Sequence, residues 1–197
     1  MREVLIEAQY LLERTPKRCA LMLILLLVSL FLAGAVFGSG TDGVDRRTVP
    51  ALDLDRYMGE WYEIARFDHP FERGMTAVRA RYTRRPEGIE VVNSGLRTAS
   101  GRRKEVRGKA RTTSDPGRLR VSFFWFFYSD YDVLELGEEY DWALVGGSSP
   151  KRLWILSRTP RLSAPTLDRI LRLAARRGYD TERLIYVEQP AEEHAVR

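Results

Sequence analysis

Residues 54–67 read LDRYMGEWYEIARF, and this stretch is the starting point for predicting the fold. Its second half is rich in aromatic and aliphatic residues, which predicts a β-strand over Glu60–His69 that stops at Pro70. Successive side chains of a strand point to opposite faces, so every second residue shares a face. One face is therefore expected to carry Trp61, Glu63, Ala65 and Phe67.

Further strand-like segments follow along the chain. In Thr76–Arg85, apolar residues alternate with charged ones, which predicts a strand with one wet face. Turn residues such as Asp115-Pro116-Gly117 separate the segments. The other predicted strands are Ile89–Asn93, Arg103–Thr112, Arg118–Tyr128, Tyr131–Leu136, Tyr140–Gly146 and Arg152–Ser157. Short strands at spacings of about ten residues are typical of an antiparallel sandwich or barrel. No long helical segment interrupts them, which excludes a doubly wound parallel sheet.

One amphipathic helix is expected after the strands. Ser163 is a suitable N-cap, because its side chain can accept a hydrogen bond from a backbone N–H of the first turn. Gly178 is expected to end the helix. A stripe at helical spacing is expected to pack on the strands and consists of Leu167, Ile170, Leu171 and Ala174. Leu184–Val187 then predicts a short last strand.

An uncharged apolar segment, Ala20–Phe37, precedes all of these elements. Its length is near the minimum for a helix that crosses a bilayer, about 18–20 residues. Lys17 and Arg18 come directly before it and favour a cytoplasmic N-terminus, with the rest of the chain outside the cytoplasm. The segment is either a cleaved signal peptide or an uncleaved anchor. The expected organisation is a tail or n-region at 1–19, the hydrophobic helix at 20–37, a linker at 38–50, the folded domain at 51–190 and a tail at 191–197.

Composition excludes several classes of protein. The chain has 32 Lys and Arg against 27 Asp and Glu, and this mild excess is spread along the sequence, which argues against nucleic-acid binding. With one Cys and two His, a disulfide scaffold and a Cys/His zinc site are both excluded, and no metal or other cofactor is expected. Neither G-x-S-x-G nor H-E-x-x-H occurs. We therefore expect no enzyme activity, and a packing or hydrogen-bonding role for His69.

Three blocks of sequence resemble the motifs of the lipocalin family. Leu54–Phe67, with its Gly-x-Trp-Tyr core, resembles the opening motif, and its continuation Asp68–Gly74 resembles the bacterial branch. Tyr140–Gly146 and Trp154–Pro160 resemble the second and third motifs, in the family's order and spacing. The resemblance implies an all-β fold: an eight-stranded up-and-down antiparallel barrel around one apolar cavity, with one external C-terminal helix and a short ninth strand. The N-terminal membrane helix or signal peptide would precede this barrel.

The resemblance also implies a structural motif at the closed end of the barrel, made of Gly59, Trp61 and Arg158. The guanidinium of Arg158 would pack over the indole of Trp61, a contact that contributes about 0.5–2 kcal/mol. Two departures from the family pattern stand out. Gly137 occupies a turn position where relatives often have Asp, and the Cys that anchors related lipoproteins is absent from its expected place.

Alternation counted from Trp61 and Arg158 predicts the lining of the cavity. The expected lining residues are Glu63, Ala65, Phe67, Ala80, Tyr82, Val91, Asn93, Val121, Phe123, Ala143, Val145, Trp154 and Leu156. Several of them are small, which would leave room for a ligand. Three are polar, namely Glu63, Asn93 and Tyr82, and buried polar groups need partners. They would either bond to one another or to water, or receive the polar end of a lipid.

The resemblance implies a lipid-binding carrier of the bacterial cell envelope, with a fatty acid or lysophospholipid as its ligand and a role in membrane maintenance. The alternatives are an envelope interaction protein with a filled barrel and a lipocalin-type enzyme that acts on a bound lipid. The barrel would lie outside the cytoplasm, at the outer membrane or anchored in the inner membrane. The aromatic run 123–128 would leave side chains exposed, which marks a contact with a membrane or with a second copy in a homodimer.

Overall fold

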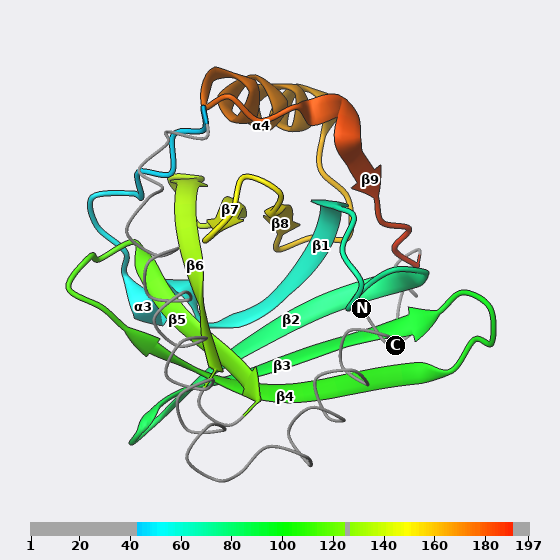
Figure 1. Ribbon diagram of the computed structural model, residues 1–197. Coiled ribbons are helices and arrows are strands. Elements are labelled where there is room, and N and C mark those ends of the chain that lie inside the picture. The colour runs from blue at the N-terminus through cyan, green and yellow to red at the C-terminus, as the bar shows by residue number, and fades with distance from the viewer. Residues whose placement is uncertain (1–42, 125–126, 191–197) are drawn as a thin grey trace, which may run out of the picture. The chain divides into compact units, whose positions relative to one another are not determined.

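The computed structural model describes residues 43–124 and 127–190 (Figure 1). The expected tail and hydrophobic helix, the start of the expected linker and the C-terminal tail lie outside the described residues, as do Trp125 and Phe126. Within those two described ranges, no helix is both long and apolar enough to cross a membrane.

Eight strands form a closed antiparallel barrel, as expected from the sequence. Each strand pairs with the next one along the chain, and β8 pairs with β1 to close the barrel. The strands are β1 (Gly59–Phe67), β2 (Met75–Arg85), β3 (Gly88–Arg97), β4 (Arg103–Thr112), β5 (Arg118–Phe124), β6 (Phe127–Leu136), β7 (Trp142–Gly147) and β8 (Leu153–Ser157). Because connections alternate between the two ends, the β1–β2, β3–β4, β5–β6 and β7–β8 connections meet at one end, which we call the mouth. The other end is the closed end.

Helical elements cover the barrel at two places. The short helix α3 (Leu54–Tyr57) precedes β1, and Asp53 caps it by accepting from the N–H groups of Asp55 and Arg56. The long helix α4 (Ala164–Arg176) follows β8 and lies along the outside of the barrel (Figure 1). Ser163 caps α4 through Thr166 N–H, and Gly178 follows its end with φ of 89°, as expected.

A ninth strand, β9 (Leu184–Tyr186), follows the 3₁₀ turn η1 (Thr181–Arg183) and pairs with the second half of β1. The first half of β1 pairs with β2 instead, so β9 takes over where β2 diverges. The side-chain amide of Gln189 bridges this junction, donating to the carbonyl oxygens of Glu63 and Val78 at 2.8 and 2.9 Å.

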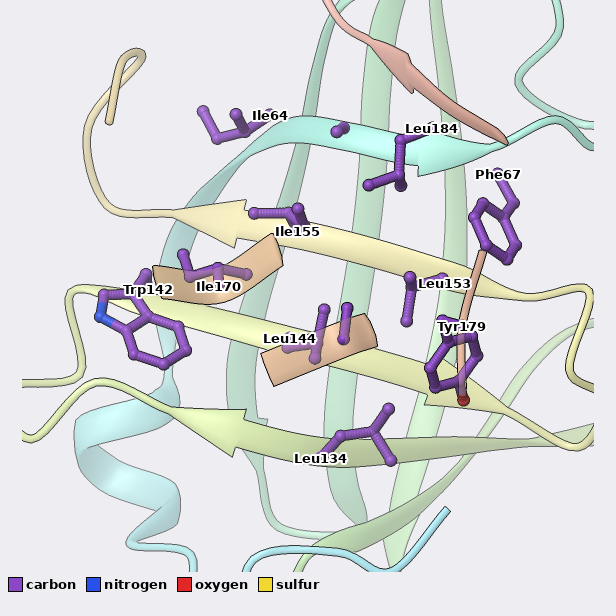
Figure 2. Close-up of a cluster of buried hydrophobic side chains, with 12 residues drawn as sticks. Ile64, Phe67, Leu134, Trp142, Leu144, Leu153, Ile155, Ile170, Tyr179 and Leu184 are labelled. Carbon is purple, nitrogen blue, oxygen red and sulfur yellow. The ribbon is translucent and has the colours of Figure 1, made fainter. Parts of the chain in front are cut away.

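Two separate apolar clusters lie on the two faces of the sheet. The outer cluster joins Ile170 and Ala174 of α4 to residues such as Leu144 and Ile155 of the strands beneath (Figure 2). The inner cluster lies on the inward face of the strands and includes Trp61, Val133 and Leu156. Apolar residues on β7 and β8 alternate between the two clusters, which is why both strands read as almost continuously apolar.

A β-bulge in β1 corrects one prediction from strand alternation. Glu63 pairs with Leu156 but Ala65 pairs with Ile155, so Ile64 is the extra residue. After the bulge the faces exchange: Ala65 and Phe67 join the outer cluster, whereas Arg66 pairs opposite the inner residue Trp154. The expectation that Ala65 and Phe67 line the interior is therefore wrong.

One expected strand boundary also differs from the structure. The strand expected over Arg118–Tyr128 ends at Phe124, and a separate strand, β6, begins at Phe127 and pairs antiparallel with β5. Two residues of the expected linker are bonded to the folded domain. Val49 N–H donates to the carbonyl oxygen of Val133 on β6 at 2.9 Å, and Asp45 N–H donates to that of Arg177 at the end of α4 at 2.8 Å.

Candidate functional site

The barrel interior brings together most of the residues expected to line it. Nine belong to or pack against the inner cluster: Ala80, Tyr82, Val91, Val121, Phe123, Ala143, Val145, Trp154 and Leu156. Trp61 of the closed-end motif belongs to the same cluster. Asn93 lies between Ala80 and Val106 in the strand register, and its buried Oδ1 has no hydrogen-bond partner. The lining also includes residues that were not expected, among them Ile89, Leu119, Tyr131 and Val133.

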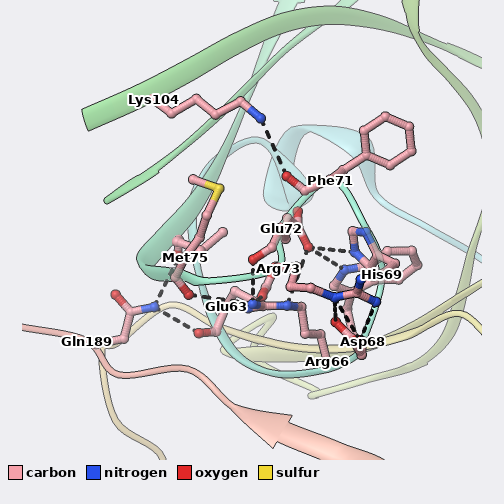
Figure 3. A network of polar contacts seen from close by, with 12 residues as sticks. Glu63, Arg66, Asp68, His69, Phe71, Glu72, Arg73, Met75, Lys104 and Gln189 are labelled. Atoms are coloured by element: carbon pink, nitrogen blue, oxygen red, sulfur yellow. Dashed lines mark hydrogen bonds and ion pairs between the residues drawn. The ribbon is translucent and has the colours of Figure 1, made fainter. Parts of the chain in front are cut away.

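A buried group of charged residues lies at the mouth (Figure 3). Arg66 is the centre of this group, with a side chain only 3% exposed, and one guanidinium nitrogen contacts Oε1 of Glu63 at 2.7 Å. Its other terminal nitrogen donates to the carbonyl oxygen of Glu72 at 2.7 Å. A buried ion costs several kcal/mol of desolvation unless it is paired, so these contacts are what allow Arg66 to stay inside the barrel.

The β1–β2 loop supplies the other half of this group. Glu72 points back toward the barrel, where its Oε2 lies 2.7 Å from Nε2 of His69 and 3.3 Å from the indole nitrogen of Trp154. The rings of His69 and Trp154 meet edge to face at 5.4 Å. The loop is thereby fastened to β1 and β8. We call Glu63, Arg66, His69, Glu72 and Trp154 the mouth cluster.

The two carboxyl groups of the mouth cluster have opposite pKa shifts. Burial, followed by the neighbouring charge of Glu72, raises the pKa of Glu63 well above its usual range, although Arg66 opposes this shift. Burial also acts to raise the pKa of Glu72, but contacts with His69, Trp154 and Arg66 outweigh it and lower that pKa. The negative charge of the cluster is therefore held mainly by Glu72.

Three tyrosine hydroxyls meet near the closed end of the barrel. The hydroxyl of Tyr131 lies 2.7 Å from that of Tyr57 and accepts from Tyr82 at 3.0 Å. Burial raises the pKa of each of the three, so all remain neutral phenols at physiological pH. Tyr82 is thus partnered by Tyr131, and Glu63 by Arg66, while Asn93 keeps a free acceptor.

Trp61 and Arg158 pack against each other at the closed end of the barrel, next to the three tyrosines. The guanidinium carbon of Arg158 lies 3.7 Å from the centre of the Trp61 ring. Arg158 also donates to the carbonyl oxygens of Glu60 and Arg56 at 2.9 and 2.7 Å, which ties β1 and α3 to the end of β8. Gly59 has φ of 96°, and a Cβ there would lie 3.3 Å from Arg158. These contacts tie β1, α3 and the end of β8 together.

The turn after β6 explains the glycine at position 137. A Cβ on Gly137 would collide with the carboxylate of Asp141 and lie 2.8 Å from the indole nitrogen of Trp142. The turn is closed through the backbone instead, with Gly137 N–H donating to Trp142 and Tyr140 N–H donating to Gly137.

Within residues 43–124 and 127–190, no group of three or more His, Cys, Asp or Glu side chains is arranged to hold a metal ion. In the described part of the chain, the barrel interior is apolar and has the buried cation Arg66 at its mouth. Sequence alternation missed Arg66 because the bulge reverses its face, and the only sequence signal for it is the acidic pair at Glu63 and Glu72, three residues before it and six after.

Comparison with known proteins identifies relatives over most of the chain. Residues 52–189 match the family described as "Lipocalin-like domain". The "Outer membrane lipoprotein Blc" of Vibrio cholerae is 44% identical over 161 residues, which are 79% of this chain and 94% of that protein. The protein of the same name from Escherichia coli is 47% identical over 142 residues, 71% of this chain and 80% of that protein.

The solved structure of insecticyanin from Manduca sexta shares the fold, with a TM-score of 0.63 at 20% identity over 75% of this chain and 86% of that one. The names of the bacterial relatives agree with a location in the cell envelope at the outer membrane, with the barrel outside the cytoplasm.

Proposed function

The chain belongs to the lipocalin family, and we propose that it is a lipid-binding carrier of the bacterial cell envelope. Its ligand would be one single-chain lipid, a fatty acid or lysophospholipid, stored or moved in the course of membrane maintenance. The observation that carries this proposal is the combination, in one interior, of an apolar inner cluster and a buried guanidinium at the mouth. An acyl chain needs the first of these features and an anionic head group needs the second.

The proposed pose follows from the positions of these groups. The acyl chain would lie among Val121, Phe123 and Trp154, where each buried CH₂ contributes about 0.8 kcal/mol before the costs of binding are subtracted. The carboxylate or phosphate would meet Arg66, and a glycerol hydroxyl could donate to the free oxygen of Asn93. The backbone carbonyl and the side-chain carboxylate of Glu72 already contact the guanidinium of Arg66 from the β1–β2 loop. Glu72 would therefore have to move away before a lipid head group could reach Arg66.

The remaining expected lining residues complete the proposed ligand site. They are Glu63 at the mouth, Ala80, Tyr82 and Val91 on β2 and β3, and Ala143, Val145 and Leu156 on β7 and β8. The proposal is a binding protein and not an enzyme, which agrees with relatives that are named as lipoproteins and lipocalins. A filled barrel is the main rival, since Glu63 and Tyr82 already have partners inside the protein.

Quenching of Trp154 by brominated lipids tests this proposal. Brominated fatty acid and lysophospholipid would be added to the full chain, and stoichiometric quenching that is lost in Trp154→Phe is expected. Two-chain phospholipids should quench less, because an eight-stranded barrel holds little more than one chain. Native mass spectrometry of the same preparation should show one retained lipid mass. No uptake from either class of single-chain lipid would favour the filled barrel.

The N-terminal region remains part of the proposal. We infer that the segment 20–37 either anchors the chain or is removed as a signal peptide, with residues 1–19 before it and a linker from 38 onward. Sequencing the N-terminus of envelope-extracted protein separates the two. A start at Met1 supports the anchor, and a start near Val36 supports cleavage.

A further inference from the structure

The strand-to-strand turns at the two ends of the barrel differ in charge. The three strand-to-strand turns at the closed end contain acidic residues and no basic ones; the acids are Glu87, Asp115, Glu138, Glu139 and Asp141. Arg84 and Arg85, nearby on β2, are paired with Asp55 and Glu90. At the mouth the balance is reversed. Its basic residues are Arg73, Arg97, Arg102, Arg103, Lys104, Lys151 and Arg152.

Most of this positive charge is not neutralised by the protein. Arg73 is paired with Asp68, and Glu72 is turned into the mouth cluster. The other basic residues of the mouth form no ion pair with any carboxylate in the described part of the chain. Arg97, Arg102, Arg103 and Lys104, together with Ser100, line a hollow on the β3–β4 hairpin. That hairpin extends past the neighbouring strand ends in Figure 1.

Large apolar side chains are exposed at the same end. Phe71 on the β1–β2 loop is 66% exposed, and Phe124 and Phe127 on the β5–β6 hairpin are 66% and 71% exposed. The Phe71 loop touches the basic hairpin, because Nζ of Lys104 donates to the carbonyl oxygen of Phe71 at 3.5 Å (Figure 3). Exposed aromatic residues beside uncompensated cations combine the two features that bind an anionic bilayer surface.

We propose that the mouth of the barrel is a docking face for an anionic membrane. The basic hollow of the β3–β4 hairpin receives lipid phosphates, and Phe71, Phe124 and Phe127 enter the interfacial region. This inference is independent of the ligand proposed above, since it concerns only the rim. It explains how the mouth would face the bilayer.

A second copy of the chain is the rival occupant. A two-fold contact places the same patch on both partners, so the basic hairpins of two copies would approach each other. Like charges brought together in an interface cost several kcal/mol. An anionic bilayer meets the same surface with opposite charge, which is why the charge distribution favours the membrane.

A depth measurement on the full chain tests the docking face. The natural Cys19 is replaced by serine, and a fluorophore is placed either at the mouth hairpin by Ala99→Cys or at the closed end by Glu138→Cys. Each labelled protein is mixed with phosphatidylcholine vesicles, with or without phosphatidylglycerol, that carry spin-labelled lipid. We expect quenching of the probe at 99 on the anionic vesicles and much weaker quenching of the probe at 138.

Charge variants show whether the effect is local. Each basic residue near an anionic surface strengthens binding roughly fivefold. The double variant Arg102→Gln/Arg103→Gln should therefore weaken binding to anionic vesicles, measured by quenching of the probe at position 99, by about 10- to 30-fold. The control Arg172→Gln/Arg176→Gln removes the same charge from the exposed face of α4 and should change it little. Phe71→Ser should reduce the quenching without changing the melting temperature.

Several results would overturn the proposal. Equal quenching at positions 99 and 138 would show that no particular end of the barrel faces the membrane. Equal loss of vesicle binding in the mouth and α4 variants would show that the protein binds through its net charge and not through the mouth. If Phe71→Ser abolishes cross-linking between copies and leaves quenching intact, the face is a dimer interface. Because lipid retention is measured separately by native mass spectrometry, failure of the carrier proposal would not be mistaken for failure of the docking face.

Discussion

Replacing Arg66 by methionine tests the mouth cluster most directly. Methionine fills similar space but carries no charge, so Glu63 loses the partner at 2.7 Å and Glu72 loses the guanidinium beneath it. Both carboxyl groups are almost inaccessible to water, with side chains 5% and 13% exposed. Breaking a buried ion pair from one side typically costs about 3–5 kcal/mol, because an uncompensated charge stays behind. We expect Arg66→Met to lower the free energy of unfolding by that amount.

Urea unfolding followed by tryptophan fluorescence measures this loss. In a domain of this size, each kcal/mol of lost stability lowers the melting temperature by about 2–4 °C, so thermal unfolding of the variant should show a fall of about 10 °C. Glu63→Gln in the same chain should restore part of the lost stability, with a coupling of about 1–3 kcal/mol, because the buried carboxyl group that contacted Arg66 is then replaced by an amide that cannot ionise.

Arg73→Met is the matched control. It breaks the ion pair with Asp68 on the same loop, where the distance is 2.6 Å but the arginine side chain is 65% exposed. Exposed pairs contribute about 0–1 kcal/mol, so this variant should be nearly as stable as the parent. If Arg66→Met costs no more than Arg73→Met, or if the double variant recovers nothing, the buried ion pairs of the mouth cluster do not stabilise the fold.

Three further outcomes follow from the contacts above. Trp61→Ala should cost about 3–5 kcal/mol in urea unfolding, since it removes a fully buried aromatic, and a stable variant that no longer takes up lipid would instead make Trp61 a ligand contact. Glu63 has a raised pKa in the folded state, so its contribution to stability is full below the unfolded pKa and is lost as pH rises through the folded value. The parent should therefore lose stability as pH rises from about 4.5, and Glu63→Gln should flatten that slope; identical slopes would contradict the assignment. Tyr131→Phe removes the hydroxyl that joins Tyr57 to Tyr82 and should cost about 1–3 kcal/mol by the same unfolding assay, whereas no measurable cost would show that water replaces it.

Local sequence signals were sufficient for the order of elements. Alternation, turn residues and the Ser163 and Gly178 caps depend on neighbours a few positions away, so eight strands, one helix and a last strand could be predicted without a structure. Inner positions on β2, β3, β5, β7 and β8 could be predicted for the same reason. The inner residues of these strands stay two positions apart along the segment that lines the barrel.

At position 64 the local sequence pattern no longer predicts which face of β1 a side chain occupies. Nothing in the residues around Ile64 announces a bulge, and a one-residue shift moves every later side chain to the opposite face. Arg66 thereby enters the barrel, while Ala65 and Phe67 leave it for the cluster under α4.

The amino-acid sequence by itself determined the strand count, the capped helix and the closed-end motif of this protein. Tertiary structure alone decided which end carries the charge, where the β1–β2 loop rests and which face of β1 looks inward. The physical reason is that a bulge is selected by hydrogen bonding between β1 and strands far away in sequence. Along one edge β1 pairs with β8. Along its other edge β1 pairs first with β2 and then with β9, which follows β1 by more than 100 residues in the sequence.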